Sequence, residues 1–186
     1  VLPNITGEHD RIRAQDELPQ SAGGKTITTT EPKFIPKEAM EIKLNGDISI
    51  KVRLVDCVGY MVDGANGHME EDMERMVKTP WSEQELPFTQ AAAIGTKKVI
   101  NDHSTIGIVV TTDGSFTEIP RENYLKAEER TILELKELRK PFVVLVNSER
   151  PYSDEAKRTV DYIEDKYNVT AIPINCEQLK KEDVHN

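Results

Sequence analysis

The second half of the chain alternates continuous apolar runs with amphipathic stretches. Residues 105–111 and 141–147 are almost entirely apolar, which is typical of parallel strands covered on both faces, and 169–174 is a shorter run of the same kind. Residues 122–140, and a stretch that begins at Ser153, place their apolar side chains on one side, as surface helices do. Strands that alternate with helices predict a wound α/β sheet.

The first half follows a different pattern. Residues 1–36 are polar and aperiodic and contain four prolines, so no long element is expected there. Residues 40–55 predict a β-hairpin closed at Asn45-Gly46, because apolar and polar positions alternate in its second strand. Residues 60–87 are rich in Gly, Met and acidic residues without a period and predict a long mobile loop, and residues 88–102 predict a helix.

Composition and charge narrow the classes of function. The chain has 186 residues, 37% of them hydrophobic and 31% charged, which is typical of a single globular domain. Its net charge of −9 argues against nucleic acid as a partner, because such binding neutralises phosphates with basic side chains. A nucleotide needs only a few local donors and is not excluded. Cys57 and Cys176 have no metal-ligand spacing and are expected to be buried, reduced thiols of a cytosolic protein.

The first candidate for chemistry is the end of the predicted strand 47–55. In wound sheets, ligands collect beyond the carboxyl ends of the strands. Here the strand delivers Asp56, with Gly59 three residues later, which fits a Walker B motif of the Asp-x-x-Gly type. Asp56 would hold Mg²⁺ through a water, and Gly59 would let the main chain approach a γ-phosphate. The motif is short and common, so an Asp that merely starts a turn is the alternative.

The second candidate is the threonine-rich segment 26–32, upstream of the hairpin. Hydroxyls before a strand that leads to a Walker B motif lie where a switch threonine would sense Mg²⁺ and the γ-phosphate; an ordinary loop or edge strand is the alternative. The neighbouring residues 23–26 (GGKT) do not fit a phosphate-binding loop. Pro19 stands where the motif needs its first glycine, and neither a strand before it nor a helix after it is predicted.

The third candidate is 147–150 (NSER), at the end of the second apolar strand. Regulatory GTPases carry Asn-Lys-x-Asp at this place, and the Asp accepts hydrogen bonds from guanine. Arg150 stands in that position and has donors only, which favours adenine over guanine. A surface cation near the start of a helix is the alternative for Arg150.

The order of these segments is that of a GTPase-like domain. We therefore expect an α/β fold: a three-layer P-loop NTPase with a mainly parallel sheet and one antiparallel hairpin strand. Such a domain starts with a strand, a phosphate loop and a helix, and residues 1–5 would be the tail of that helix. Residues 1–186 are thus expected to be a single domain without its first strand, its phosphate loop and most of its first helix.

Longer motifs resemble the stage IV sporulation protein A family. They span nearly the whole chain and are idiosyncratic, which makes the resemblance specific. The motifs are 16–22 (DELPQSA), 29–34 (TTEPKF), 53–60 (RLVDCVGY), 79–81 (TPW), 103–107 (HSTIG), 112–114 (TDG), 147–148 (NS) and 150–152 (RPY).

The resemblance implies an ATPase from a spore-forming bacterium, with a P-loop NTPase fold of the translation-GTPase type. Members of the family bind and hydrolyse ATP and self-assemble into a homopolymeric layer around the forespore, which is the platform for the spore coat. ATP and Mg²⁺ are the implied cofactors. A small amphipathic membrane-bound sporulation peptide and other spore coat proteins are the implied partners, and no nucleic acid is. The implied location is the mother-cell cytoplasm, peripheral to the outer forespore membrane.

The resemblance also assigns roles to residues. Asp56 matches the Walker B acid and metal ligand, and Thr29 and Thr30 match the paired sensor threonines. The nucleotide-binding residues would be Gly59, Asn147, Ser148 and Arg150. The Walker A lysine and its neighbouring Ser or Thr have no counterpart, so we expect these residues alone to be inactive, to fold poorly or to bind ATP weakly. A non-catalytic assembly scaffold and a GTPase are the rival interpretations.

Overall fold

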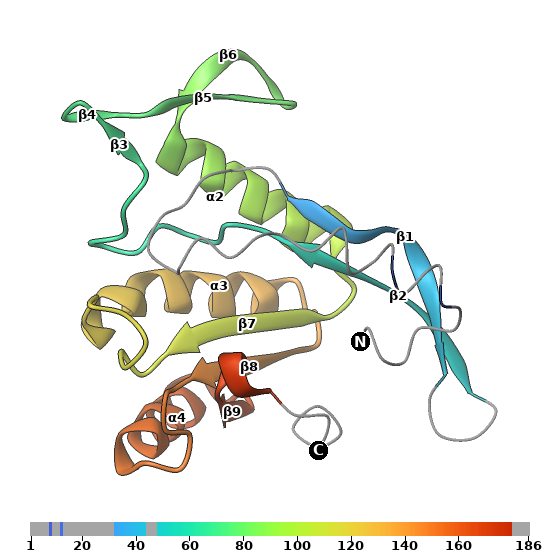
Figure 1. Cartoon of the computed structure of the whole chain (residues 1–186), viewed down its shortest axis with the longest axis vertical. Helices are drawn as coiled ribbons and strands as arrows, with labels where there is room; N and C mark the ends of the chain where they lie inside the picture. Colours follow the sequence, from blue (N-terminus) through green and yellow to red (C-terminus); the bar gives the residue numbers. More distant parts are fainter. Residues whose placement is uncertain (1–7, 9–11, 13–31, 44–47, 180–186) are drawn as a thin grey trace.

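A sheet of three parallel strands organises the C-terminal half of the protein (Figure 1). The computed structural model describes residues 8, 12, 32–43 and 48–179. Within this part β7 (Gly107–Thr112), β8 (Phe142–Asn147) and β9 (Ala171–Ile174) pair in that order, and all of them run in the same direction. The prediction of a mixed α/β fold with a parallel sheet is confirmed.

Two helices cover one face of this sheet. They are α3 (Leu125–Glu137), which continues the 3₁₀ turn η3 (Arg121–Tyr124), and α4 (Asp154–Tyr167). The helical prediction from Ser153 is confirmed in detail, because the Ser153 Oγ accepts a hydrogen bond of 3.2 Å from the Ala156 N–H. The core between the helices and the sheet contains Ile132, Leu135, Val144, Val146, Ile163 and Tyr167.

The opposite face of the sheet is open among the described residues. Ile108 and Val110 of β7 are 58% and 60% exposed, and Ile172 of β9 is also exposed. Val109 and Thr111, which alternate with them, are buried against the helices. The sequence prediction that residues 105–111 are covered on both faces is therefore wrong for the described part of the chain.

An antiparallel hairpin precedes this unit. It consists of β1 (Lys33–Lys43) and β2 (Ser49–Asp56), in a register that places Lys33 opposite Asp56 and Lys43 opposite Ser49. The hairpin is confirmed, but its first strand begins well before residue 40. An irregularity between Ile35 and Met40 lets the pairing continue on the other side of Pro36. The predicted turn at Asn45-Gly46 lies outside the described residues.

The segment between β2 and the next helix contains two small hairpins instead of a long loop. They are β3 (Met69–Glu70) with β4 (Met73–Glu74), and β5 (Met76–Thr79) with β6 (Ser82–Pro87), and both lie away from the parallel sheet (Figure 1). The prediction of a loop over residues 60–87 is wrong here. Local main-chain hydrogen bonds hold these strands and most of their side chains face solvent, so no apolar period marks them.

A long helix joins these hairpins to β7. It begins as α2 (Phe88–Lys98) and ends as the π-helix η2 (Val99–His103), which confirms the helix predicted over 88–102. Glu74 caps its first turn from outside, because its carboxylate accepts the Thr89 N–H at 3.0 Å and also the Thr89 hydroxyl. Among the helices described, none has the length and apolar character needed to cross a membrane.

β2 and β7 each have an unpaired edge in this arrangement. Within the described residues β2 pairs only with β1, and β7 pairs only with β8. Both strands point in the same direction in Figure 1, towards the side where the loops after β7 lie. The space beside these edges is where the candidate site is found.

Candidate functional site at the carboxyl ends of the strands

A cavity of about 420 Å³ lies between β2 and β7. Residues 55–60, at the end of β2, form one wall. All consecutive residues from 106 to 111 line another wall. Since neighbouring residues of a strand point to opposite faces, this lining means that the cavity runs along the edge of β7 and not over one of its faces. Residues of α3, such as Thr131 and Glu128, and residues of α2 and η2, such as Thr96 and Val99, line the rest of the cavity.

The predicted Walker B residues lie in this wall. Asp56 is exposed at the carboxyl end of β2, and Gly59 follows in the same wall. The backbone of Gly59 has φ +82°, and no atom lies within 4 Å of the position that a Cβ would occupy. Glycine is therefore required at residue 59 by its backbone conformation and not by crowding.

The loops after β8 and β9 are hydrogen-bonded to each other. The Asn147 side-chain oxygen accepts a bond of 2.9 Å from the Cys176 N–H, and the Asn175 Nδ2 donates to the Glu149 carbonyl at 3.3 Å. The Ser148 N–H also donates to the Ile174 carbonyl at 2.8 Å. Asn147 thus lies at the sheet edge where the sequence predicts it, and its side-chain oxygen joins the loops after β8 and β9.

The loop after β7 is part of the same polar cluster. Asp113 is buried and accepts hydrogen bonds from the Ser115 N–H, at 3.0 Å, and from the Ser115 hydroxyl. The Ser115 Oγ in turn accepts the Glu149 N–H at 2.9 Å. Burial alone would raise the pKa of Asp113, but the hydrogen bonds from Ser115 and Ser148 outweigh it and hold this pKa below its usual value.

The two remaining residues of the predicted base-binding segment have different environments. Ser148 has no exposed surface, and its Oγ accepts the Arg150 N–H at 3.0 Å, so it supports the loop from beneath. Arg150 is exposed at the loop surface, and its carbonyl accepts the Ser153 N–H at the start of α4. Only Arg150 of this pair has its side chain at a surface that a ligand could reach. Thr29 and Thr30 lie outside the described residues.

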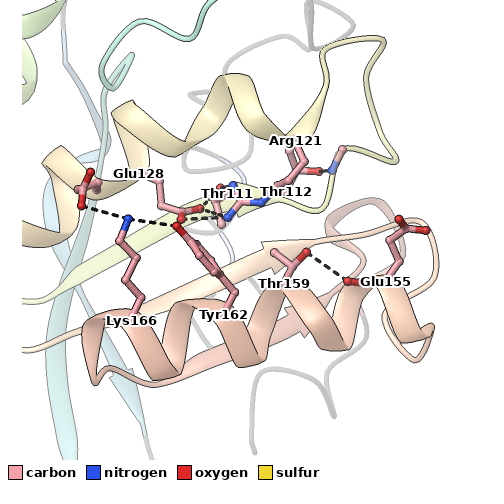
Figure 2. A network of polar contacts seen from close by, with 10 residues as sticks. Thr111, Thr112, Arg121, Glu128, Glu155, Thr159, Tyr162 and Lys166 are labelled. Carbon is pink, nitrogen blue, oxygen red and sulfur yellow. Dashed lines mark hydrogen bonds and ion pairs between the residues drawn. The ribbon is translucent and has the colours of Figure 1, made fainter.

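A buried ion pair fixes the end of β7 to α3 (Figure 2). The Arg121 Nη2 lies 2.7 Å from the Glu128 Oε2, and the Glu128 side chain is only 1% exposed. The Thr111 hydroxyl donates to the same carboxylate at 2.7 Å and accepts from Arg121 at 3.3 Å. Each of these polar groups has a partner, as burial requires. Lys166 of α4 reaches Glu129 of α3 at 3.1 Å, which joins the two helices.

Sequence reasoning missed part of this cluster. Asn175 follows β9 directly, so the signal that identified Asn147, a polar residue at the end of an apolar strand, was present for it as well. Asp113 follows β7 in the same way. The pairing of Arg121 with Glu128 had no such signal, because it depends on how η3 and α3 pack against Thr111.

The two cysteines carry free thiols and are only partly buried. Burial raises the pKa of both, so each is held in the protonated form at neutral pH. Cys57 lines the cavity beside Asp56, whereas Cys176 lies in the loop after β9. Among the residues that the structure describes, no group of three His, Cys, Asp or Glu side chains could hold a metal ion.

The described residues fit one part of a Mg²⁺–nucleotide site. Mg²⁺ retains several waters and needs only one or two carboxylates from a protein, and Asp56 offers one at an accessible strand end. The polar loops after β7, β8 and β9 meet at one edge of the sheet, where wound α/β domains bind their ligands. The fold is that of a wound α/β domain with a polar cluster at the carboxyl edge of its parallel sheet.

Comparison with known proteins gives the family. Residues 1–186 match the family model described as "Stage IV sporulation protein A, ATPase domain". The chain therefore belongs to this family. No solved structure matches it.

Three similar relatives all carry the name stage IV sporulation protein A. The protein from Bacillus anthracis is 50% identical over the whole of this chain, that from Bacillus subtilis (strain 168) 52% over 99%, and that from Clostridioides difficile (strain 630) 53% over 99%. The chain spans 37–38% of the length of these relatives.

Proposed function

We propose that this domain binds Mg·ATP at the carboxyl ends of its strands and hydrolyses it in the full-length protein. One observation carries the proposal: Asp56 ends β2 in the wall of a cavity, and the polar loops after the parallel strands meet at the carboxyl edge of their sheet. The membership of an ATPase-domain family supports it.

The proposed fold is a three-layer P-loop NTPase of the translation-GTPase type, with residues 1–186 as part of one such domain. In this fold a strand upstream in the chain enters between β2 and β7 and pairs with both free edges. The free edges and the cavity between them support this placement. The helices that would cover the exposed face of Ile108 and Val110 make the third layer.

Each site residue has a proposed task. Asp56 would hold Mg²⁺, and Gly59 would present its main chain to the γ-phosphate. Thr29 and Thr30 would sense that phosphate and order the attacking water. When bound, Mg²⁺ offsets the negative charge on the phosphates. Catalysis is then a matter of positioning and electrostatic stabilisation, which the fixed loops provide.

Adenine is the proposed base. Asn147 and Ser148 hold the loop after β8 in shape, and Arg150 stands at its surface where a guanine-specific carboxylate would otherwise lie. A donor at this position does not match the N–H groups of guanine. Competition of unlabelled GTP against labelled ATP tests this directly, and equal competition by GTP would favour the rival GTPase.

The proposed biological role is in sporulation. The full-length protein self-assembles into a homopolymer on the forespore and forms the base layer of the spore coat. Its partners are a small amphipathic membrane-bound peptide and other spore coat proteins. Its location is the mother-cell cytoplasm at the outer forespore membrane. The names of the three relatives support the sporulation part of this proposal.

The test is a pair of substitutions in the chain extended to the length of the relatives. Asp56→Ala removes the proposed magnesium ligand and is expected to lower ATP hydrolysis by at least about a hundredfold. Asp161→Ala, an exposed carboxylate on α4, is the matched control and is expected to leave turnover unchanged. Normal hydrolysis by the Asp56→Ala protein would contradict the assignment of Asp56 as the magnesium ligand.

A non-catalytic assembly scaffold is the second candidate. Met69, Met73 and Met76 are exposed on the hairpins, and Met73 alone has 71% of its surface open to solvent. Exposed methionines next to acidic residues are typical of a protein-binding surface. If assembly is equally fast with ATP, with a non-hydrolysable analogue and without nucleotide, this scaffold role is favoured.

A further inference from the structure

The residue directly after Gly59 is anchored on α3. Tyr60 is 8% exposed, and its hydroxyl donates a hydrogen bond to the Glu134 Oε2. The guanidinium carbon of Arg130 lies 3.7 Å from the centroid of the Tyr60 ring, and Arg130 also pairs with Glu134 at 3.4 Å. Ring and hydroxyl are therefore held by one turn of the same helix, in an arrangement that we term the Tyr60 anchor (Tyr60, Arg130 and Glu134).

A second contact holds the same loop a few residues later. The Asn123 side-chain nitrogen donates to the Asp63 carbonyl at 2.8 Å, and the Ala65 N–H closes a turn on the Val62 carbonyl at 3.0 Å. The ion pair of Lys126 with Asp63, at 3.7 Å, is fully exposed to solvent and contributes little. The loop after β2 thus lies along η3 and α3 (Figure 1).

These contacts bear on the conformation of Gly59, because no side chain packs against residue 59 at the position of a Cβ. Glycine has access to a wide range of backbone conformations, and no atom lies within 4 Å of its would-be Cβ. Packing at residue 59 itself therefore does not choose its conformation. Tyr60 limits the conformation of Gly59 instead. Because the Tyr60 side chain is buried and hydrogen-bonded, the chain can leave Gly59 in few directions.

The hydroxyl remains a donor at neutral pH. Burial, and then the hydrogen bond and the negative charge of Glu134, raise the pKa of Tyr60 well above its ordinary value. Arg130 acts in the opposite direction but does not outweigh them. The Tyr60 hydroxyl therefore keeps the proton that it donates to Glu134.

We propose that Tyr60 is a positioning residue for ATP hydrolysis: by its attachment to Glu134 and Arg130 of α3 it holds Asp56–Gly59 in the conformation that hydrolysis needs. This inference rests on the proposed function. It goes further by proposing that α3 helps to position the main chain of Gly59 for its contact with the γ-phosphate.

The experiment compares two tyrosines in the chain extended to the length of the relatives. Tyr60→Phe keeps the ring on Arg130 and removes only the hydroxyl. It is expected to lower kcat about tenfold and to change KM for Mg·ATP less than twofold. Tyr162→Phe is the matched control, because the Tyr162 hydroxyl contacts Lys166 at 3.0 Å on α4 and is not part of the anchor. It is expected to keep wild-type kcat.

Substitutions of Glu134 test whether the two residues act together. Glu134→Ala should lower kcat as far as Tyr60→Phe does, and the double variant should be no slower than either single variant. Glu134→Gln keeps an acceptor for the hydroxyl and should restore most of the rate. Hydrogen exchange should quicken at residues 57–65 in Tyr60→Phe and should stay unchanged in Tyr162→Phe.

The outcomes separate this inference from the function on which it rests. If the wild-type protein does not hydrolyse ATP, the proposed function fails and the inference fails with it. If the wild-type protein is active and Tyr60→Phe keeps its kcat, the inference alone is overturned. It is also overturned if the losses from Tyr60→Phe and Glu134→Ala multiply in the double variant, because the residues would then act independently.

Discussion

The main-chain nitrogen of Cys176 donates a hydrogen bond of 2.9 Å to the side-chain oxygen of Asn147. Asn147 is the last residue of β8 and Cys176 lies just after β9, so this bond joins the ends of neighbouring parallel strands. A second bond, from Asn175 to the Glu149 carbonyl, joins the same two loops. The carboxyl edge of the sheet is thus a connected polar surface and not a set of separate loops.

We predict that Asn147→Ala weakens ATP binding by about tenfold, since one hydrogen bond that orients the loop after β9 is lost. Equilibrium binding of a fluorescent ATP analogue to the full-length protein measures the change. Asn101→Ala, an exposed residue of η2, is the control and should bind normally. Unaltered affinity in Asn147→Ala would show that this loop does not take part in binding.

We predict that Glu128→Leu is strongly destabilising. The substitution leaves Arg121, whose side chain is 18% exposed, without its buried partner, and such losses amount to about 3 kcal/mol. Urea unfolding followed by circular dichroism measures the effect. Arg158→Ala removes one partner of an exposed pair with Glu155 and should change the free energy of unfolding by less than about 0.5 kcal/mol. A similar change in both variants would contradict the prediction.

We predict that Gly59→Ala lowers the rate of ATP hydrolysis strongly while it lowers the free energy of unfolding only slightly. The left-handed conformation at residue 59 costs an alanine about 1 kcal/mol, and no neighbouring atom clashes with the added methyl group. The main chain can relieve this cost by rotating away from the nucleotide. Gly64→Ala has a similar backbone conformation, φ +88°, outside the cavity wall and serves as the control. Equal activities of the two variants would argue against a role for Gly59.

We predict that Asp113 makes stability depend on pH in the acid range. The pKa of Asp113 is lower in the folded than in the unfolded chain, so its contribution is fully present above the unfolded value of about 3.9 and is lost as the pH falls further. Asp113→Asn should therefore flatten the decline of the free energy of unfolding below about pH 4. Urea titrations from pH 2.5 to pH 7 on both proteins measure this. Parallel curves would contradict the prediction.

The free edges of β2 and β7 predict a difference in hydrogen exchange. Amides on an unpaired edge exchange fast, so we expect β2 and β7 to exchange much faster in residues 1–186 alone than in the chain extended upstream. Mass spectrometry on the two proteins compares them peptide by peptide. β8, which is paired on both sides, is the internal control and should change least. Identical exchange of β7 in the two proteins would exclude an added strand.

The sequence predicted most of the parallel unit because its signals are local. The apolar runs of β7 and β8 and the Ser153 cap need no knowledge of distant residues. The two hairpins over residues 69–87 could not be found in this way, because main-chain hydrogen bonds hold them and their polar side chains resemble those of a loop. The length of β1 was also underestimated, since its pairing resumes beyond an irregularity.

The candidate site was predicted unevenly for a related reason. Asp56, Gly59 and Asn147 each follow a recognisable strand, and the structure places all three at strand ends. The role of Ser148 could not be read from its position, because only tertiary packing shows that it lies under the loop. The same holds for the Tyr60 anchor, in which Tyr60 is 70 or more residues from Arg130 and Glu134 in the chain.

The unpaired edges of β2 and β7 also have a consequence for how the protein folds. The unit from β7 to β9 joins segments that follow one another along the chain, so it can form early, and the same is true of the β1–β2 hairpin. No strand pairing joins these two units within the described residues. An upstream strand that pairs with both edges would join the two units. The pairing that joins them would then also complete the proposed nucleotide site.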